Sequence, residues 1–205
     1  MKKLLTISMI LLTATLYSFA GGGLNVGDNA KDFKLKNIDG KYVSLSDMKD
    51  VRGVIVIFTC NHCPFAKAYE DRIIALDKKF KKEGYPVVAI NPNDPKESPE
   101  DSYEAMQTRA KEKGFTFPYI FDETQEIATA YGAAHTPHVF LLQKQADGQF
   151  KVAYIGAIDN DTENKLSAKE KKNYVEDAIA ALKSGKQPDP SSTKAIGCTI
   201  KWRKA

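Results

Sequence analysis

Two short apolar runs stand out in the middle of this chain, at residues 54–58 and 86–90. Neither contains a charged residue, and a short run of this kind predicts a strand that is buried on both faces. Between the two runs, apolar residues recur at helical intervals, at Phe65, Tyr69, Ile73, Leu76 and Phe80. This spacing predicts a helix over roughly residues 64–82 that closes near Gly84.

Alternation of apolar and polar residues predicts further strands. Residues 33–36 alternate phenylalanine and leucine with lysine, and an Asp-Gly pair at 39–40 separates them from a second apolar stretch at 42–45. Residues 139–142 and 152–155 flank another Asp-Gly pair in the same way. Each arrangement predicts an antiparallel hairpin, one near the N-terminus and one in the second half of the chain.

Start and stop signals predict three further helices. A serine, a proline and two acidic residues open a helix over about 98–113, and a short helix over 125–131 ends at Gly132. A capping box opens the last helix, over about 167–184, which ends before Gly185. The two central strand–helix–strand passages imply right-handed crossovers. The chain is therefore predicted to be an α/β domain, with a central mixed β-sheet flanked by helices on both faces.

The first twenty residues have the pattern of a signal peptide. Lys2 and Lys3 make a positive start, residues 4–17 are almost wholly apolar or small, and in Ser18-Phe19-Ala20 the serine and the alanine offer small side chains for cleavage. An uncleaved membrane anchor is the alternative, but the apolar stretch is short for a span of about twenty residues. We therefore expect a periplasmic or secreted protein with no stable membrane insertion after signal cleavage.

One domain is expected over residues 27–184, preceded by the signal peptide at 1–20 and a flexible glycine-rich leader at 21–26. A tail over 185–205 follows the domain. It turns apolar again at Ile196, Cys198, Ile200 and Trp202. A tail kept only for solubility would not carry these side chains, so we expect it to pack back onto the domain.

Charge argues against one class of partner. The 30 Lys and Arg residues and 26 Asp and Glu residues give a formal net charge of +4, and lysines are interleaved with acidic residues along the predicted helices. The sequence has no basic stripe with interleaved aromatic residues. It therefore predicts no binding to nucleic acid.

The segment with the most chemical meaning joins the first buried strand to the first helix, and it is Cys60-Asn61-His62-Cys63-Pro64. Two cysteines at this spacing can close a disulfide. Pro64 suits the first turn of a helix, where its missing N–H costs nothing. Cys60 would then lie at the positive end of the helix, which favours the thiolate that attacks disulfides. The spacing therefore predicts thiol–disulfide chemistry.

Two alternatives to redox chemistry are an inert disulfide and a structural zinc site. A zinc knuckle needs a second Cys/His pair, which Cys198 alone does not provide. His62 lies between the two cysteines, where a partly protonated imidazole would lower a thiol pKa and make the disulfide more oxidising. Alternatively, His62 points to solvent and tunes nothing.

Cys198 is left over once the other two cysteines pair. One interpretation is a small buried hydrophobe, since free cysteines are among the most buried residue types. The other is a third redox thiol that reaches the Cys60–Cys63 site, because an unpaired thiol in an oxidising compartment is a liability unless it is shielded or used.

In its order of strand, Cys-x-x-Cys helix, strand, helix, Thr136-Pro137, hairpin and helix, the chain resembles the thioredoxin superfamily. It is most similar to the exported redoxin-like branch related to the peroxiredoxins and the AhpC/TSA antioxidant proteins. The resemblance spans about residues 27–184, and the segment 117–122 also carries it. It implies a thioredoxin-like fold with an N-terminal β-hairpin and thiol–disulfide oxidoreductase activity. It implies no organic cofactor, because the electrons reside on sulfur.

The same resemblance implies roles for single residues. Cys60 would be the exposed nucleophile, and Cys63 would be the resolving thiol that closes the disulfide. Pro137 would follow a cis peptide bond and face the cysteines, and together with Thr136 it would position an extended substrate strand. The expected partners are protein thiols and disulfides, together with an unidentified redox partner.

One departure from the family pattern makes a thiol-dependent peroxidase the alternative rather than the first expectation. Peroxiredoxins carry a Pro-x-x-x-Thr-x-x-Cys motif whose cysteine attacks peroxide. When that cysteine is matched to Cys63, the threonine position holds Cys60 and the proline position holds Val56. Both supporting residues are therefore missing.

A further alternative is a copper- or zinc-binding delivery module of thioredoxin fold. All three histidines of the chain, His62, His135 and His138, fall in the same two loops as the features above. Thiolates and imidazoles suit copper(I) or zinc. The ligands in this alternative would be Cys60, Cys63, His135 and His138; in the preferred interpretation no metal is bound.

Overall fold

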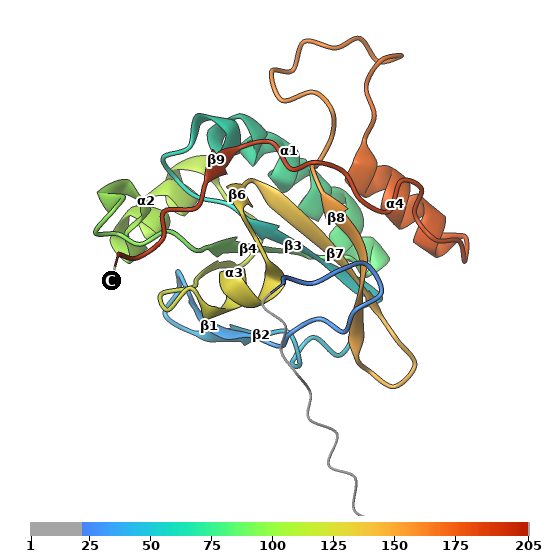
Figure 1. Ribbon diagram of the computed structural model, residues 1–205, viewed down its shortest axis with the longest axis horizontal. Helices are drawn as coiled ribbons and strands as arrows, with labels where there is room; N and C mark the ends of the chain where they lie inside the picture. The colour runs from blue at the N-terminus through green and yellow to red at the C-terminus, as the bar shows by residue number, and fades with distance from the viewer. Residues whose placement is uncertain (1–21, 205) are drawn as a thin grey trace, which may run out of the picture.

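A central seven-stranded sheet organises the computed structural model, which describes residues 22–204 (Figure 1). The strand order is β2-β1-β5-β4-β3-β7-β8. The strands are β1 (Lys34–Asn37), β2 (Tyr42–Ser44), β3 (Gly53–Phe58), β4 (Val87–Asn91), β5 (Tyr119–Phe121), β7 (His138–Lys144) and β8 (Phe150–Gly156). Neighbours β3, β4 and β5 run parallel, β7 pairs antiparallel with β3, and β8 pairs antiparallel with β7, so the sheet is mixed as predicted.

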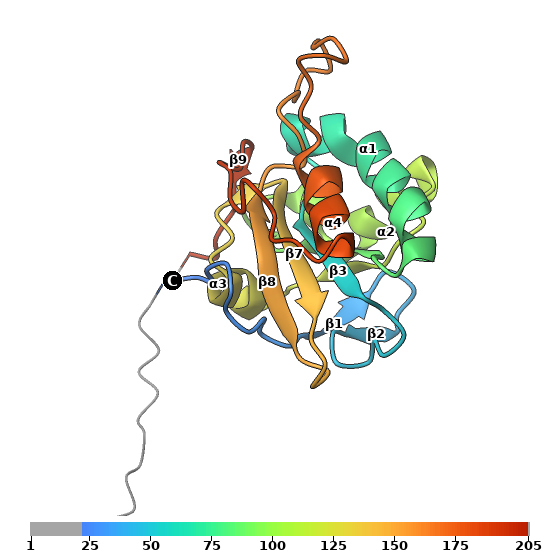
Figure 2. The same ribbon diagram turned by 90° about the vertical axis from the view of Figure 1, so that its right-hand side faces the viewer.

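Helices cover both faces of this sheet, which also confirms the prediction. They are α1 (Pro64–Phe80), α2 (Tyr103–Lys113), α3 (Glu126–Tyr131) and α4 (Tyr174–Lys183), with short 3₁₀ turns η1 (Lys81–Glu83) and η2 (Pro99–Asp101). Figure 2 shows α1, α2 and α4 on one side of the sheet and α3 on the other. The period of two along a strand produces this division, because successive side chains point to opposite faces.

Strand β3 illustrates the division. Ile55 and Ile57 pack into the layer formed with α1, α2 and α4, whereas Val54, Val56 and Phe58 pack into the layer formed with α3. All five side chains are fully buried. Burying a side chain of this size contributes about 1.5–3 kcal/mol, so β3 is held firmly from both faces.

Both predicted hairpins form. Strands β1 and β2 pair antiparallel around the turn at Asp39 and Gly40, and β7 pairs with β8 around Gly148. The N-terminal hairpin is not a separate element, because β1 also pairs with β5 and so extends the main sheet.

Helix α2 begins later than the sequence predicted. The segment Pro99–Asp101 forms a 3₁₀ turn, and the chain then becomes extended at Ser102 (φ −62°, ψ 159°). The Ser102 hydroxyl, rather than that of Ser98, accepts the N–H of Ala105 and caps the helix, 3.3 Å away. The proline and the acidic residues therefore belong to a connecting loop.

Helix α4 also begins later than predicted, at Tyr174. One of the two capping-box contacts does form, since the Ser167 backbone N–H donates to the Glu170 carboxylate at 3.1 Å. The backbone of Lys172, however, is bound to Asn160 in both directions, by Asn160 N–H to Lys172 O and by Lys172 N–H to Asn160 Oδ1. These bonds to a distant loop hold the segment outside a helix.

The described part of the segment expected as a flexible leader, residues 22–26, is packed, which corrects that expectation. Leu24 N–H donates to Tyr131 O at 3.1 Å. Gly23 lies so close to Gly132 that a Cβ on Gly23 would fall 2.2 Å from the Gly132 Cα. The predicted signal peptide at 1–20 lies outside the described residues. Within residues 22–204, no helix has both the length and the apolar character needed to cross a membrane.

The tail after α4 returns along the upper edge of the molecule (Figure 1). There β9 (Cys198–Thr199) pairs antiparallel with β6 (His135–Thr136) in a separate two-stranded sheet. Ile200 is 3% exposed and packs in the α3 layer, while Ile196 and Trp202 remain 48% and 42% exposed. The contact is therefore made by β9 and Ile200 rather than by all the apolar side chains of the tail.

Candidate active site

The two cysteines lie where β3 passes into α1, at the carboxyl end of the parallel strands. Cys63 is the N-cap residue of α1, and Pro64 follows it in the first turn. Cys60 therefore lies before the helix rather than at its end, which corrects the sequence-based placement. Cys60 is 3% exposed and Cys63 is 0% exposed, so neither thiol is the exposed nucleophile that the resemblance implied.

Thr136 contacts both cysteines from the far side of the site. Its hydroxyl lies 3.1 Å from Cys60 Sγ, and its backbone carbonyl oxygen lies 3.3 Å from Cys63 Sγ. The peptide bond between Thr136 and Pro137 is cis. Residues more than seventy positions apart in the sequence are thus brought into direct contact.

Asp101 is a member of the site that sequence analysis missed. Its fully buried carboxylate accepts the backbone N–H of Asn61 at 2.6 Å, the hydroxyl of Ser98 at 2.7 Å and the side-chain amide of Asn93 at 2.8 Å. It also lies 2.5 Å from Nδ1 of His62. The His62 ring is therefore turned inward and anchored, not directed to solvent.

The family model described as AhpC/TSA family matches residues 26–153. The chain belongs to the AhpC/TSA family. The crystal structure of an uncharacterized conserved protein from Geobacillus kaustophilus is 36% identical in sequence, with a TM-score of 0.79, and covers 88% of this chain and 94% of its own. A hypothetical protein from Sinorhizobium meliloti 1021 is 31% identical, also with a TM-score of 0.79, and covers 90% and 98%.

Among curated relatives, the thiol-disulfide oxidoreductase ResA of Geobacillus thermodenitrificans is 26% identical over 166 residues, which is 76% of this chain and 88% of that protein. These findings confirm the predicted membership of the thioredoxin superfamily and the redoxin-like, peroxiredoxin-related branch. The thioredoxin-like fold is confirmed with them.

In this AhpC/TSA protein the ionisation of the two cysteines is opposite to the sequence expectation. Hydrogen bonding from Cys60, then from Cys198 and the Ala66 N–H, lowers the pKa of Cys63 to about 4. Hydrogen bonding to Cys63, burial and the charge of Asp101 raise the pKa of Cys60. The N-cap position supports the same direction, because helix N-termini favour anions. The thiolate is therefore favoured at Cys63 and the thiol at Cys60.

An acid titration of the reduced protein tests this assignment. The ultraviolet absorbance of a thiolate should persist down to about pH 4 and should vanish in Cys63→Ser. Cys60→Ala should shift the midpoint upward by about one to two pKa units, because a hydrogen bond to a charged group contributes about 1.5–3 kcal/mol. A Cys63→Ser variant that keeps the acid-stable signal would place the thiolate elsewhere.

The ligands expected for the metal alternative, which include His135 and His138, do not come together as one group in the described residues. In the part of the chain that the structure describes, one group of three donors lies within 4.8 Å of one another, and it consists of Cys60, His62 and Asp101. The ring of His138 instead lies on Phe140, with ring centroids 4.7 Å apart. Burial, and secondarily the neighbouring His135, lower the pKa of His138 to about 4.

Asp101 escaped sequence analysis because its segment also fits the first turn of a helix. Ser98-Pro99-Glu100-Asp101 is a good helix opening by composition alone. One signal could have identified it: the segment follows β4, whose carboxyl end lies beside that of β3. A loop leaving that edge reaches the cysteines.

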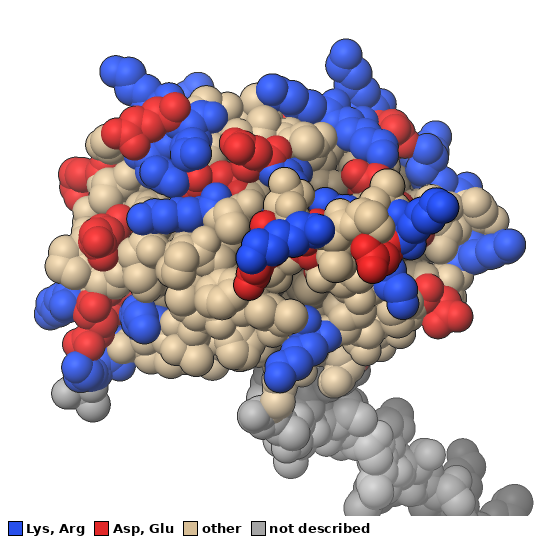
Figure 3. Space-filling view, turned by 90° about the horizontal axis from the view of Figure 1, so that it is seen from above, with Lys and Arg blue, Asp and Glu red and all other residues tan. Residues whose placement is uncertain are grey.

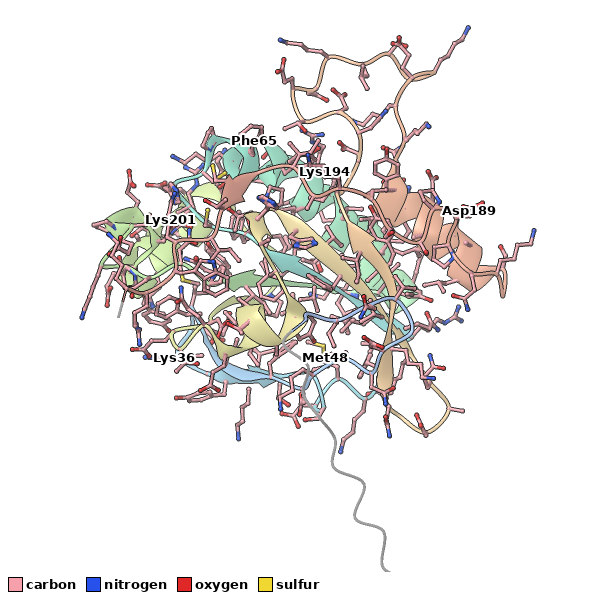
Figure 4. The ribbon with its side chains drawn as sticks, in the orientation of Figure 1. Lys36, Met48, Phe65, Asp189, Lys194 and Lys201 are labelled. Carbon is pink, nitrogen blue, oxygen red and sulfur yellow. The ribbon has the colours of Figure 1, made fainter. Side chains whose placement is uncertain are left out.

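A cleft of about 440 Å³ opens beside the first turn of α1. Its lining includes Pro64, Phe65, Arg72 and the loop 162–165. Figure 4 labels Phe65 on α1, near β9, and this side chain is 37% exposed. On the same upper face, Figure 3 shows basic and acidic side chains interspersed, so a partner would meet a surface of mixed charge next to the cysteines.

Proposed function

We propose that this protein catalyses thiol–disulfide exchange with protein thiols and disulfides through Cys60 and Cys63. The observation that carries the proposal is Cys63 at the N-cap of α1, where hydrogen bonds from Cys60, Cys198 and Ala66 favour its thiolate. Curated relatives named thiol-disulfide oxidoreductase support it. The chemistry needs no organic cofactor, because two thiols and one disulfide exchange electrons directly.

Because Cys63 is 0% exposed, the site must open to admit a partner disulfide, and in the proposed reaction the Cys63 thiolate then attacks one of its sulfurs. A Cys63–partner bond forms, the partner disulfide breaks, and one partner sulfur leaves as a thiolate. Cys60 then attacks Cys63 Sγ, which forms the Cys60–Cys63 disulfide and releases the second partner thiolate. The two electrons lost by the cysteine pair reduce the partner, and the reverse sequence would oxidise it.

Two further roles follow for the surrounding side chains. Cys60 must lose its proton before it attacks, and His62 is proposed to take this proton. The Cys60 sulfur, a ring nitrogen of His62 and a carboxylate oxygen of Asp101 lie within 4.8 Å of one another. Asp101 is a positioning residue that holds the His62 ring. Thr136 and Pro137 are proposed to position the substrate strand, because Thr136 contacts both sulfurs.

Reduction of insulin by dithiothreitol is the direct test. The wild-type protein should accelerate the reaction, and the double variant Cys60→Ser/Cys63→Ser should not, since both exchanging sulfurs are gone. His62→Ala should slow the step in which the partner is released. Equal rates for wild type and the double variant would disprove the proposed function. The reduction potential of the pair in glutathione buffers would then separate an oxidant of partners from a reductant.

The proposed place of action is the periplasm or the exterior of the cell. The support is the N-terminal sequence, with two lysines, an apolar stretch and small residues up to Ala20. N-terminal sequencing of the protein from an exported fraction should give Gly21 as the first residue. A protein that keeps Met1 and stays with the cytoplasmic fraction would contradict export.

Peroxide reduction is a second candidate, favoured by one observation. Cys63, which matches the peroxidatic position of the family, is the sulfur whose pKa is lowered. The family's threonine and proline are replaced by Cys60 and Val56, however, so the hydroxyl that would assist peroxide is missing. We therefore expect slow peroxide consumption beside fast disulfide exchange, which a direct comparison of the two rates would check.

A further inference from the structure

Strand β9 pairs with the strand that holds Thr136, the residue whose atoms contact both active-site cysteines. In the β6–β9 ladder Cys198 is paired with Thr136, and Thr199 with His135. Ile200 N–H continues the ladder by donating to Ala134 O at 3.2 Å. The main chain of the tail therefore covers the edge of the loop that a substrate strand would approach.

The side chain of Cys198 points into the same cluster. It packs against the buried group formed by Cys60, Cys63 and Ala66, and the contact with Cys198 is one of the causes that lower the pKa of Cys63. Cys63 thus lies between two thiols, one from its own loop and one from the tail. Burial, and to a smaller extent contact with Cys63, raises the pKa of Cys198 to about 11, so Cys198 is the protonated member of this pair.

Contacts made by the residues that follow β9 hold the tail in this place. Lys201 N–H donates to Asn93 Oδ1 at 2.9 Å, and Lys201 O accepts Asp94 N–H at 2.9 Å and the Gln125 side-chain amide at 2.9 Å. Arg203 adds an ion pair with Asp94 at 3.1 Å. Docking of the tail is therefore built into the backbone and does not rest on apolar contact alone.

Gly197 lies tightly against the backbone of the active-site loop. A Cβ there would lie 2.1 Å from Thr136 O and 2.6 Å from Thr136 C. Both are backbone atoms and cannot move aside as a flexible side chain would. Any larger residue would lift β9 away from Thr136, and Cys198 with it.

We propose that Cys198 is a third redox thiol of this site, which takes the place of a partner cysteine and forms an internal disulfide with Cys63. The proposal rests on the proposed exchange activity and adds a second internal acceptor to it. The supporting observation is that two other thiols, buried Cys60 and half-buried Cys198, pack with Cys63, because disulfide exchange needs a thiol directly beside the sulfur it attacks.

The step is an isomerisation within the oxidised protein. The thiolate of Cys198 attacks Cys63 Sγ in the Cys60–Cys63 disulfide, so the Cys63–Cys198 bond forms and the Cys60–Cys63 bond breaks. Cys60 leaves as a thiolate and takes up the proton that Cys198 gave up. No electron enters or leaves the protein, and the oxidant that first forms a disulfide is the partner disulfide of the proposed function.

The test removes Cys60 and asks whether the remaining pair still closes. Cys60→Ser, treated with oxidised glutathione, should lose both remaining thiols and give a peptide pair joined through Cys63 and Cys198 in a non-reducing digest. Adding Gly197→Ala should slow this closure by at least about tenfold, because the displaced tail carries Cys198 away from Cys63. No sulfur is changed in this variant. Gly22→Ala is the matched control, because a Cβ there meets nothing within 4 Å.

Two results would overturn the inference and leave the proposed function intact. One is a Cys60→Ser protein that stops as a glutathione adduct on Cys63, with Cys198 free, while the wild type still reduces insulin. The other is closure at the same rate with and without Gly197→Ala, or at the same rate in urea, since proximity in the fold would then not be the cause. A wild-type protein that cannot reduce insulin, yet whose Cys60→Ser variant closes the internal disulfide, would instead reject the proposed function alone.

Discussion

Replacing Cys63 by serine should leave about 1% or less of the wild-type turnover in disulfide exchange. In the wild type the pKa of Cys63 is lowered to about 4, so this sulfur is ionised at neutral pH. In the variant, burial and the charge of Asp101 still raise the pKa of the remaining Cys60 above its ordinary value of 9.0. The thiolate fraction of such a group at neutral pH is about 1% or less, and part of this loss is recovered because a more basic thiolate is more nucleophilic.

The variant loses a second function of Cys63 as well. Both neighbouring thiols, Cys60 and Cys198, contact this sulfur, so neither internal disulfide through Cys63 can form. A mixed disulfide on Cys60 then has no partner at the helix terminus to release it. Turnover of insulin and the rate of a single reaction with a small aromatic disulfide should be measured side by side.

Cys60→Ser is the matched control for this experiment. It keeps the ionised sulfur, so its first reaction with the small disulfide should stay within about tenfold of the wild-type rate. If that first reaction is lost in Cys60→Ser and retained in Cys63→Ser, then the attacking sulfur is Cys60, as the sequence had suggested. That result would reverse the proposed order of attack without affecting the exchange activity itself.

Phe140→Ala should lower the free energy of unfolding by about 3–5 kcal/mol, out of a total of about 5–15 kcal/mol. Phe140 is 1% exposed on β7 and forms a three-ring cluster with Phe58 and Tyr131, at centroid distances of 5.7 Å and 5.2 Å. Phe58 and Tyr131 also meet each other edge to face at 5.6 Å. Removing the central ring leaves a cavity that this closed packing cannot fill, and urea unfolding followed by circular dichroism measures the cost.

Tyr42→Ala is the matched control, since Tyr42 is also an aromatic residue on a strand but is 63% exposed. Its loss should change the free energy of unfolding by about 0.5 kcal/mol or less. Equal losses in the two variants would mean that the ring cluster is not what holds α3 against the sheet. The difference between the two variants, rather than either value alone, measures the contribution of the ring cluster to the free energy of unfolding.

The elements whose signal is local can be predicted from the sequence alone. Strand β3 and helix α1 follow from an unbroken apolar run and a helical repeat, and both hairpins follow from alternation around Asp-Gly turns. The cysteine spacing likewise places two thiols at the end of a buried strand without any knowledge of the rest of the molecule. Neighbours in sequence suffice for these predictions, because side-chain periodicity alone decides which face is buried.

Local signals failed where a distant partner competes for the same backbone groups. The helix openings at 98–101 and 167–170 have suitable composition, yet the first belongs to a loop that brings Asp101 to the site. The second does not enter a helix, because Asn160 binds the Glu170 carbonyl and the backbone N–H of Lys172 just after it. Capping preferences of about 1 kcal/mol are easily outweighed by several tertiary hydrogen bonds to buried groups.

The charge of the site depends on contacts that the sequence does not reveal. Sequence reasoning assigned the thiolate to Cys60, but the pKa of each cysteine depends first on its hydrogen bond to the other; burial and Asp101, forty-one positions away, also raise the pKa of Cys60, and Cys198 in the tail helps to lower that of Cys63. Electrostatic and hydrogen-bond effects act over a few ångströms in space whatever the separation along the chain. The sequence therefore identifies the reacting cysteines, whereas the folded arrangement of three distant segments determines which of them carries the negative charge.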